Sequence, residues 1–247
     1  YLCTDPYIPD VSGAPEGVSR LLQEADIAAG SKFETLELEQ RRRLSSLIAL
    51  RLIQEGVTLD TMMEVSRPRY FLPGWDMDSE GLASLFNACG RMDMEGMGIS
   101  LALGDEPSMR EAKSINRDYR VNIVQSVTQV RDNGLVSMDN IQYFHSPSTG
   151  FTGIMCGIAM QFFADPGKPT LGLSRKEETV RVSGRATWKL LEKGVDLSSA
   201  LREASQKAGG NGGGHRIASG GAFPLANEDL FLQELNAIIG AQLLTSR

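Results

Sequence analysis

Residues 209–223 form the most glycine-rich stretch of the chain, and they limit its fold more than any other segment. They read GGNGGGHRIASGGAF, so five of the first six are glycine, and one of the chain's two histidines follows directly. Glycine tolerates positive φ, and successive N–H groups can converge on one point to bind an anion, usually phosphate. A flexible linker is the general alternative for a glycine run. Because an apolar segment follows without a break, where a linker would stay polar, we predict an ordered loop.

Several classes of protein are excluded by composition. The 247 residues are 41% hydrophobic and 23% charged, which is ordinary for a folded protein with one large or two small domains. The sequence contains no run of about 18 apolar residues, so it predicts no membrane-spanning helix. It also has no signal-peptide pattern at its start. The glycine run matches neither the P-loop nor the G-x-G-x-x-G dinucleotide motif. The three cysteines, Cys3, Cys89 and Cys156, are widely spaced, so we expect reduced thiols and a cytoplasmic protein.

The charge of the chain is unevenly distributed. The net charge is −6, which argues against a broadly basic protein that binds duplex DNA. Residues 181–221 nevertheless contain seven Lys or Arg and three acidic residues, a net charge of +4 that leaves −10 for the rest. The positive charge is therefore concentrated around the glycine stretch, where it would favour a phosphate backbone.

The pattern of elements predicts an α/β protein. Apolar residues at helical spacing predict a mostly helical segment up to about residue 133, with the longest helix beginning at Pro107 and ending at Asn133. Short β-like runs and helices then alternate: strands near residues 141–144, 170–174 and 179–183, and helices near 153–163, 187–193, 197–208 and 227–244. We place a domain boundary at this change, giving domains of residues 1–133 and 134–247.

Two groups of residues are candidates for binding a phosphate. Ser183 and Arg185 are two positions apart on a predicted strand, so their hydroxyl and guanidinium share a face and can bind one phosphate. An ion pair on the surface is the alternative for Arg185. His215, between Gly214 and Arg216, can donate to a phosphate oxygen, whereas His145 has no comparable setting and is interpreted as a turn residue.

The sequence resembles the DHH phosphoesterases, and in particular the RecJ-like single-strand exonucleases of the archaeal type. GGHRIASGG, beginning at Gly213, matches the GGH-x-x-A-x-G signature of the DHHA1 domain that accompanies these enzymes. FNACGRM, which contains Arg91, is similar to the segment that closes the phosphoesterase core, and residues 4–13 look like the chain that follows the catalytic domain. The resemblance implies a DHHA1-type domain, with a mixed β-sheet flanked by helices, after the helical segment.

The resemblance also implies roles for individual residues. His215 would contact the scissile phosphate as the catalytic residue, with Gly213, Gly214 and Arg216 binding substrate beside it. Arg91, Ser183 and Arg185 would hold the 5′ phosphate of a single strand. The family's D-x-D and D-H-H motifs, which hold two metal ions, are absent, since Asp76-Met77-Asp78 is better explained by a helix cap. We therefore expect Mn²⁺ or Mg²⁺ in a preceding DHH domain, no metal on this chain, and no cleavage by this chain alone.

Two other functions remain open at this stage. The chain could be a stand-alone nucleic-acid-binding module, although the NACGR and SGR segments fit the nuclease pattern better. It could instead be an inactive, Cdc45-like replication scaffold, although such a scaffold has no need of the intact GGGH sequence. The expected partners are single-stranded DNA or RNA, or a short oligonucleotide, with the preceding DHH domain and replication proteins as candidate protein partners and no membrane.

Overall fold

The chain forms two compact units, Tyr1–Gln125 and Ser126–Arg247. The computed structural model describes residues 11, 14–31, 33–57, 59, 62–63, 70–147 and 150–245. The segment 4–13 that contributes to the family resemblance therefore lies outside the described residues, except for Val11. The domain boundary predicted after residue 133 falls at the end of α6 (Glu106–Asn133), whose last residues belong to the second unit. No helix within the described ranges is long and apolar enough to cross a membrane.

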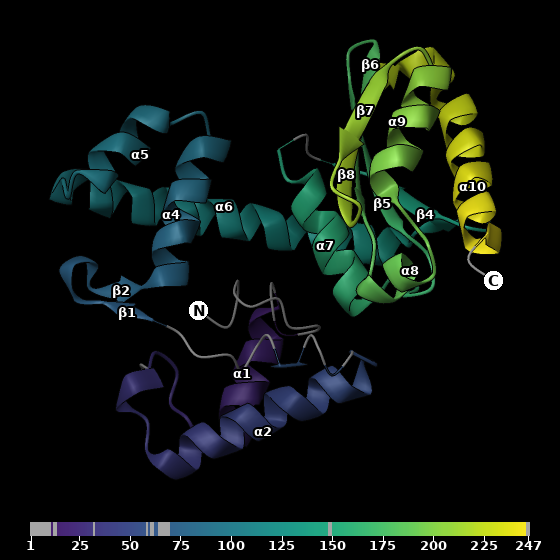
Figure 1. Cartoon of the computed structure of the whole chain (residues 1–247). Helices are drawn as coiled ribbons and strands as arrows, with labels where there is room; N and C mark the ends of the chain where they lie inside the picture. Colours follow the sequence, from purple (N-terminus) through teal and green to yellow (C-terminus); the bar gives the residue numbers. More distant parts are fainter. Residues whose placement is uncertain are drawn as a thin grey trace. The chain divides into compact units, whose positions relative to one another are not determined.

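The first unit is mainly helical (Figure 1). Its described elements are α1 (Pro15–Glu24), α2 (Leu38–Gln54), a short ribbon of β1 (Phe71–Leu72) and β2 (Met77–Asp78), α4 (Ser79–Arg91), α5 (Glu95–Ala102) and most of α6. Asp78 caps α4 by accepting a 2.7 Å hydrogen bond from the N–H of Gly81, which confirms the cap predicted for that residue. The helix continues one residue past Gly90, and the small residues that follow form part of α5.

The second unit is built on a mixed sheet of six strands in the order β3-β4-β5-β6-β8-β7. Only β4 and β5 are parallel, and α7 connects them. The strands are β3 (Val136–Ser137), β4 (Gln142–His145), β5 (Thr170–Lys176), β6 (Thr179–Arg185), β7 (Asn211–Gly214) and β8 (Ala218–Pro224). The helices are α7 (Thr152–Phe162), α8 (Trp188–Glu192), α9 (Leu197–Lys207) and α10 (Glu228–Thr245). The α/β class, the mixed sheet and the flanking helices predicted from the sequence are confirmed.

Helices cover both faces of this sheet. α7 packs on β5 and β6 from one side, and α9 and α10 lie on the other side (Figure 1). The main core fills the α9 side, where Leu171, Val182, Leu201 and Phe231 are among the buried residues. Side chains alternate between the two faces along β6, so Val180 and Val182 point into this core and Ser183 faces α7.

The glycine stretch is the main correction to the sequence prediction. It is an ordered β-hairpin of β7 and β8, not a loop, and it pairs with β6 through β8. At two of these positions the structure shows why only glycine fits. Gly214 has a φ of +145°, which L side chains rarely adopt, and a Cβ at Gly212 would lie 2.5 Å from the carbonyl oxygen of Leu201 in α9. The glycines thus let an edge strand approach α9 closely, and their backbones are organised by strand pairing rather than as an anion-binding loop.

Candidate functional site

Ser183 and Arg185 point to the α7 face of the sheet. Between them, Gly184 faces the opposite side, because a Cβ there would lie 2.9 Å from Leu171 and 3.2 Å from Leu201 of the core. Strand alternation therefore places the Ser183 hydroxyl and the Arg185 guanidinium together, as the spacing predicts. Both residues are half-buried, and Arg185 Nη1 donates a 2.9 Å hydrogen bond to the carbonyl oxygen of Gly184.

The first turn of α7 lies against both side chains. A Cβ at Gly153 would be 3.0 Å from Arg185 Nη2 and 3.7 Å from Ser183 Oγ. The N-cap residue, Phe151, makes no side-chain hydrogen bond to this turn. A helix N-terminus carries a partial positive charge from its N–H groups, and here a guanidinium and a hydroxyl lie beside it. Three kinds of donor that favour phosphate therefore meet at Gly153.

Tight packing fixes α7 on the strands at this point. A Cβ at Gly172 of β5 would lie 2.6 Å from Thr152 Cγ2 and 2.9 Å from both Cys156 Sγ and Phe144 Cζ. The Cys156 thiol donates a 3.2 Å hydrogen bond to the carbonyl oxygen of Ser183. Burial raises the pKa of Cys156 to about 12, against a smaller opposing effect of the Arg185 charge. The thiol is therefore protonated at neutral pH and helps to hold the Ser183 backbone against α7.

His215 lies at the turn between β7 and β8. Its N–H and carbonyl oxygen bond to Ala218 at 2.9 and 3.1 Å, and Ser219 Oγ donates a 2.7 Å hydrogen bond to the same carbonyl. The turn borders the end of β6, since Ala218 pairs with Arg185 and the N–H of Ala186 donates to Ile217. The His215 backbone is thus fixed at the Arg185 end of the sheet, while the residue itself is exposed.

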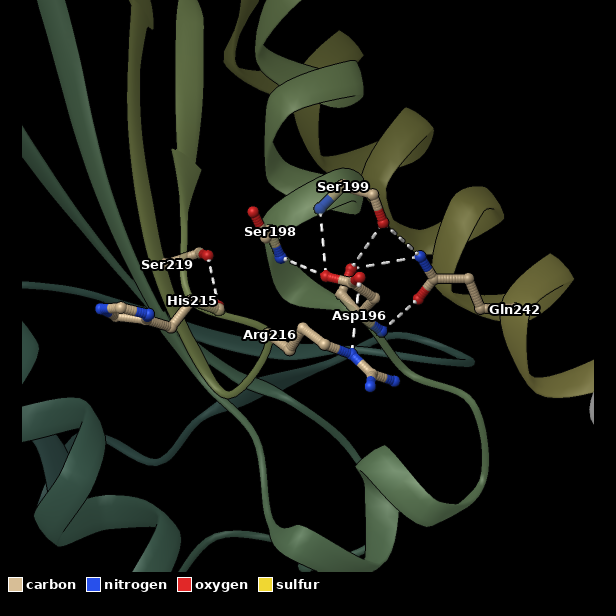
Figure 2. A network of polar contacts seen from close by, with 7 residues as sticks. All are labelled: Asp196, Ser198, Ser199, His215, Arg216, Ser219 and Gln242. Carbon is tan, nitrogen blue, oxygen red and sulfur yellow. Dashed lines mark hydrogen bonds and ion pairs between the residues drawn. The ribbon is translucent and has the colours of Figure 1, made fainter.

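Arg216 lies in the same turn, but its side chain is directed elsewhere. Its Nε is 3.6 Å from Asp196 Oδ2, and Figure 2 shows the His215 ring directed away from this ion pair. Asp196 also caps α9 by accepting from the N–H groups of Ser198 and Ser199, and its own backbone bonds to Gln242 of α10. Arg216 is therefore part of a network that ties the hairpin to two helices. Its predicted role in substrate binding remains a prediction.

Arg91, the remaining predicted residue, belongs to the first unit. It lies in the last turn of α4, and its positive charge acts on Tyr119 of α6. Burial raises the pKa of Tyr119, and the charge of Arg91 partly opposes this rise. The other predicted residues all lie in the second unit, so a site shared with Arg91 remains a prediction.

The sequence interpretation missed one polar cluster, formed by His145, Arg175 and Glu228. Arg175 donates to both carboxylate oxygens of Glu228, at 2.9 Å from Nε and 2.6 Å from Nη2, and His145 Nε2 lies 2.7 Å from Glu228 Oε1. The hydrogen bonds from Arg175 lower the pKa of Glu228 against the opposing effect of burial, and the bond to His145 adds to this lowering. His145 is therefore an anchor between β4 and α10, not an isolated turn residue. Its partner is 83 residues away, so no sequence spacing signals the contact.

The described residues include no group of three or more His, Cys, Asp or Glu side chains that could hold a metal ion. They therefore do not fit the pair of metal ions that the family resemblance implies, and no chemical step through a metal can be derived for them. Binding of Mn²⁺ or Mg²⁺ by a preceding domain remains a prediction.

Comparison with known families identifies the second unit, because the model of the DHHA1 domain family matches residues 140–241. These residues are a DHHA1 domain. An uncharacterized protein of Methanocaldococcus jannaschii is 29% identical over 242 residues. The alignment covers 98% of this chain and 51% of that protein, so the chain spans about half the length of this curated relative.

Solved structures with a similar fold match most of the chain. RecJ of Thermus thermophilus in complex with Mn²⁺ is 16% identical with a TM-score of 0.51, over 82% of this chain and 30% of that one. Cdc45 of Entamoeba histolytica is 9% identical with a TM-score of 0.58, over 92% of this chain and 51% of that one. The predicted resemblance to the DHH/DHHA1 family, with a RecJ-like fold, is confirmed.

Proposed function

We propose that this chain is the substrate-binding portion of a RecJ-like phosphodiesterase and that it binds the 5′ phosphate of single-stranded nucleic acid. The DHHA1 domain supports a function in nucleic-acid processing of the DHH kind. The observation that carries the finer proposal is the convergence of Ser183 Oγ, the Arg185 guanidinium and the first turn of α7 at Gly153. A terminal phosphate has more charge and more free acceptor oxygens than an internal phosphodiester, so these donors favour a strand end.

Each remaining residue has a role that follows from its place. His215, at the hairpin turn beside the end of β6, would contact the next phosphate along the strand, with Gly213 and Gly214 allowing close approach. Arg91 would add a second guanidinium from the first unit. The metal ions and the attacking water would come from a DHH domain of the whole protein, so removal of nucleotides from the 5′ end is proposed for that protein and not for this chain. A cytoplasmic location also remains a proposal, based on the expected reduced thiols.

The test is fluorescence-anisotropy binding of the 247-residue chain to a short single-stranded oligonucleotide that carries either a 5′ phosphate or a 5′ hydroxyl. We expect tighter binding of the phosphorylated end. Arg185→Ala should weaken it by roughly 10- to 100-fold, because a hydrogen-bonded charge pair is lost, and should leave the hydroxyl end nearly unchanged. Arg185→Lys, which keeps the charge but loses the two-pronged geometry, should have an intermediate effect.

Lys193→Ala is the matched control, since it removes one exposed positive charge from the same basic segment. Thermal unfolding of each variant separates a loss of binding from a loss of folding. Equal affinity for both ends at two salt concentrations would contradict the end-binding site and favour a generic strand-binding module. No binding of either oligonucleotide would favour the scaffold alternative.

A further inference from the structure

On the α7 face of the sheet, further positive charges lie beyond the site formed by Ser183 and Arg185. Arg181 precedes Ser183 by two positions on β6, so it shares the same face, and it is exposed. Ser174 of β5 is paired with Arg181 and therefore lies on the same face. Lys176 is two positions after Ser174 in β5, so it also lies on this face. We call Lys176, Arg181 and Arg185 the cationic row. With a rise of about 3.3 Å per residue, Arg181 and Arg185 are about 13 Å apart along β6.

Nothing acidic on the neighbouring elements neutralises this row. No Asp or Glu occurs in α7, the helix that covers this face, or in β5, β6, β7 and β8. Glu177 and Glu178 lie in the turn between β5 and β6, beyond the end of the row. On the opposite face, by contrast, Arg175 is paired with the buried carboxylate of Glu228. Within the part of the chain that the structure describes, no residue of the cationic row forms an ion pair, so its charge is available to a ligand.

The β8 residues beside the row have only small side chains. The β6–β8 register places Ala222 opposite Arg181, Gly220 opposite Ser183 and Ala218 opposite Arg185. All three are partly exposed, and Gly213 of β7 continues this surface beyond Gly220. An extended chain could therefore approach the backbone closely along β8 while its charges face the row.

We propose that this face binds the sugar–phosphate backbone of a single strand. The strand would pass from the Arg185 end of the sheet, where His215 would contact the second phosphate, along β6 and β8 towards Arg181, and Arg181 would contact a later phosphate. This inference rests on the proposed function, because it continues the strand whose 5′ end would lie at Ser183 and Arg185. The occupant follows from charge and shape: a cationic row beside a smooth surface suits a flexible polyanion, whose contacts need no base-specific donors.

The experiment measures the affinity of the full chain for 5′-phosphorylated oligothymidylates, from a mononucleotide to eight nucleotides, over a range of salt. For the wild type, affinity should rise over the first few nucleotides. In Arg181→Ala the mononucleotide should bind as before, the gain with length should shrink, and the slope of log K against log salt should fall by about 0.7 for the octamer. Arg181→Lys should restore the slope, because it restores the charge.

A second pair of variants tests the same surface without removing a native charge. Ala222→Lys should steepen the salt slope by about 0.7, because it adds a cation beside Arg181, and Ala222→Glu should weaken octamer binding only. Lys193→Ala serves again as the control of equal charge change. If Arg181→Ala and both Ala222 variants leave the length dependence and salt slope unchanged in folded protein, the proposed path of the strand is wrong.

The two proposals can fail separately. Preference for a 5′ phosphate without any effect of Arg181 or Ala222 would overturn the path along β6 and leave the end site standing. Equal binding of phosphate and hydroxyl ends, with the Arg181 effect intact, would overturn the end site and support the backbone-binding face. Absence of binding to every oligonucleotide would overturn both.

Discussion

Among single residues, Glu228 gives the clearest link between geometry and pH. Its pKa is held below the usual value of 4.5, mainly by the hydrogen bonds from Arg175. A lowered pKa in the folded state means that the stabilisation is fully present above about pH 4.5 and is lost as the pH falls through the folded value. Glu228→Gln should therefore lower the free energy of unfolding by about 1–3 kcal/mol at pH 7, and by less at pH 3, which is below the usual pKa of a glutamate. Urea unfolding at the two pH values measures both.

The neighbouring Asp229 provides the control for this prediction. It lies in the same first turn of α10 and is exposed, so Asp229→Asn removes the same charge without breaking the cluster. The stability of the Asp229→Asn variant should depend on pH in the same way as that of the wild type. An equal loss for Glu228→Gln at pH 3 and pH 7 would show that packing, not the ionised carboxylate, stabilises this end of the sheet.

Single residues also show which parts of the site the sequence could predict. The spacing of Ser183 and Arg185 is enough to place both on one face, because strand periodicity is a local property. Their third neighbour, Gly153, lies in another element, and local spacing carries no information about which helix covers a strand. The pairing of Arg216 with Asp196 and of His145 with Glu228 was missed for the same physical reason, since each depends on tertiary contacts between distant segments.

At the scale of whole elements, the packing of α7 on β5 determines the geometry of the phosphate site. A side chain at Gly172 would collide with Thr152, Cys156 and Phe144, so Gly172→Ala should displace α7 from the sheet. We expect a loss of about 1–3 kcal/mol in stability from overpacking. Preference for the 5′ phosphate should also weaken, because Gly153 would move relative to Arg185. Gly157→Ala in the same helix is the control: its Cβ would meet nothing within 4 Å, so it should be neutral or slightly stabilising. If both variants bind the 5′-phosphorylated oligonucleotide equally well, α7 does not contribute to the phosphate site.

The elements themselves were largely predictable, with one instructive exception. Apolar periodicity, caps and turn residues located α6, α7, α9 and α10 to within a few residues, because these signals are local. The glycine stretch was predicted to be an ordered loop, because glycine tolerates positive φ and lets N–H groups converge. Glycine also has low strand propensity and no side chain to show alternation, so its sequence carries no signal for a strand. In the structure its strands are selected by sterics: β7 lies too close to α9 for any larger residue at Gly212. A tertiary approach thus overrides the local preference.

Across the whole molecule, the division into two units separates the contributions of Arg91 and of the DHHA1 domain. Gly153, Ser183, Arg185 and His215 all belong to the second unit, which has a core of its own running from Ile141 to Ile239. We therefore expect a fragment of residues 126–247 to unfold cooperatively and to keep its preference for a 5′ phosphate. Anisotropy and thermal unfolding of the fragment, beside the full chain, measure both properties.

Arg91→Ala in the full chain completes this comparison. If Arg91 adds a guanidinium to the same phosphate, the variant should bind the phosphorylated end roughly 10-fold more weakly, as expected for one charge-assisted hydrogen bond, and should then match the fragment. If the variant binds like the wild type, Arg91 does not contact the phosphate, and its charge acts only within the helical unit, for example on Tyr119. If the fragment folds but does not prefer the 5′ phosphate, the DHHA1 domain alone is insufficient for this preference. The three kinds of donor at Gly153 would then need a fourth, from the helical unit, to distinguish a terminal phosphate from an internal one.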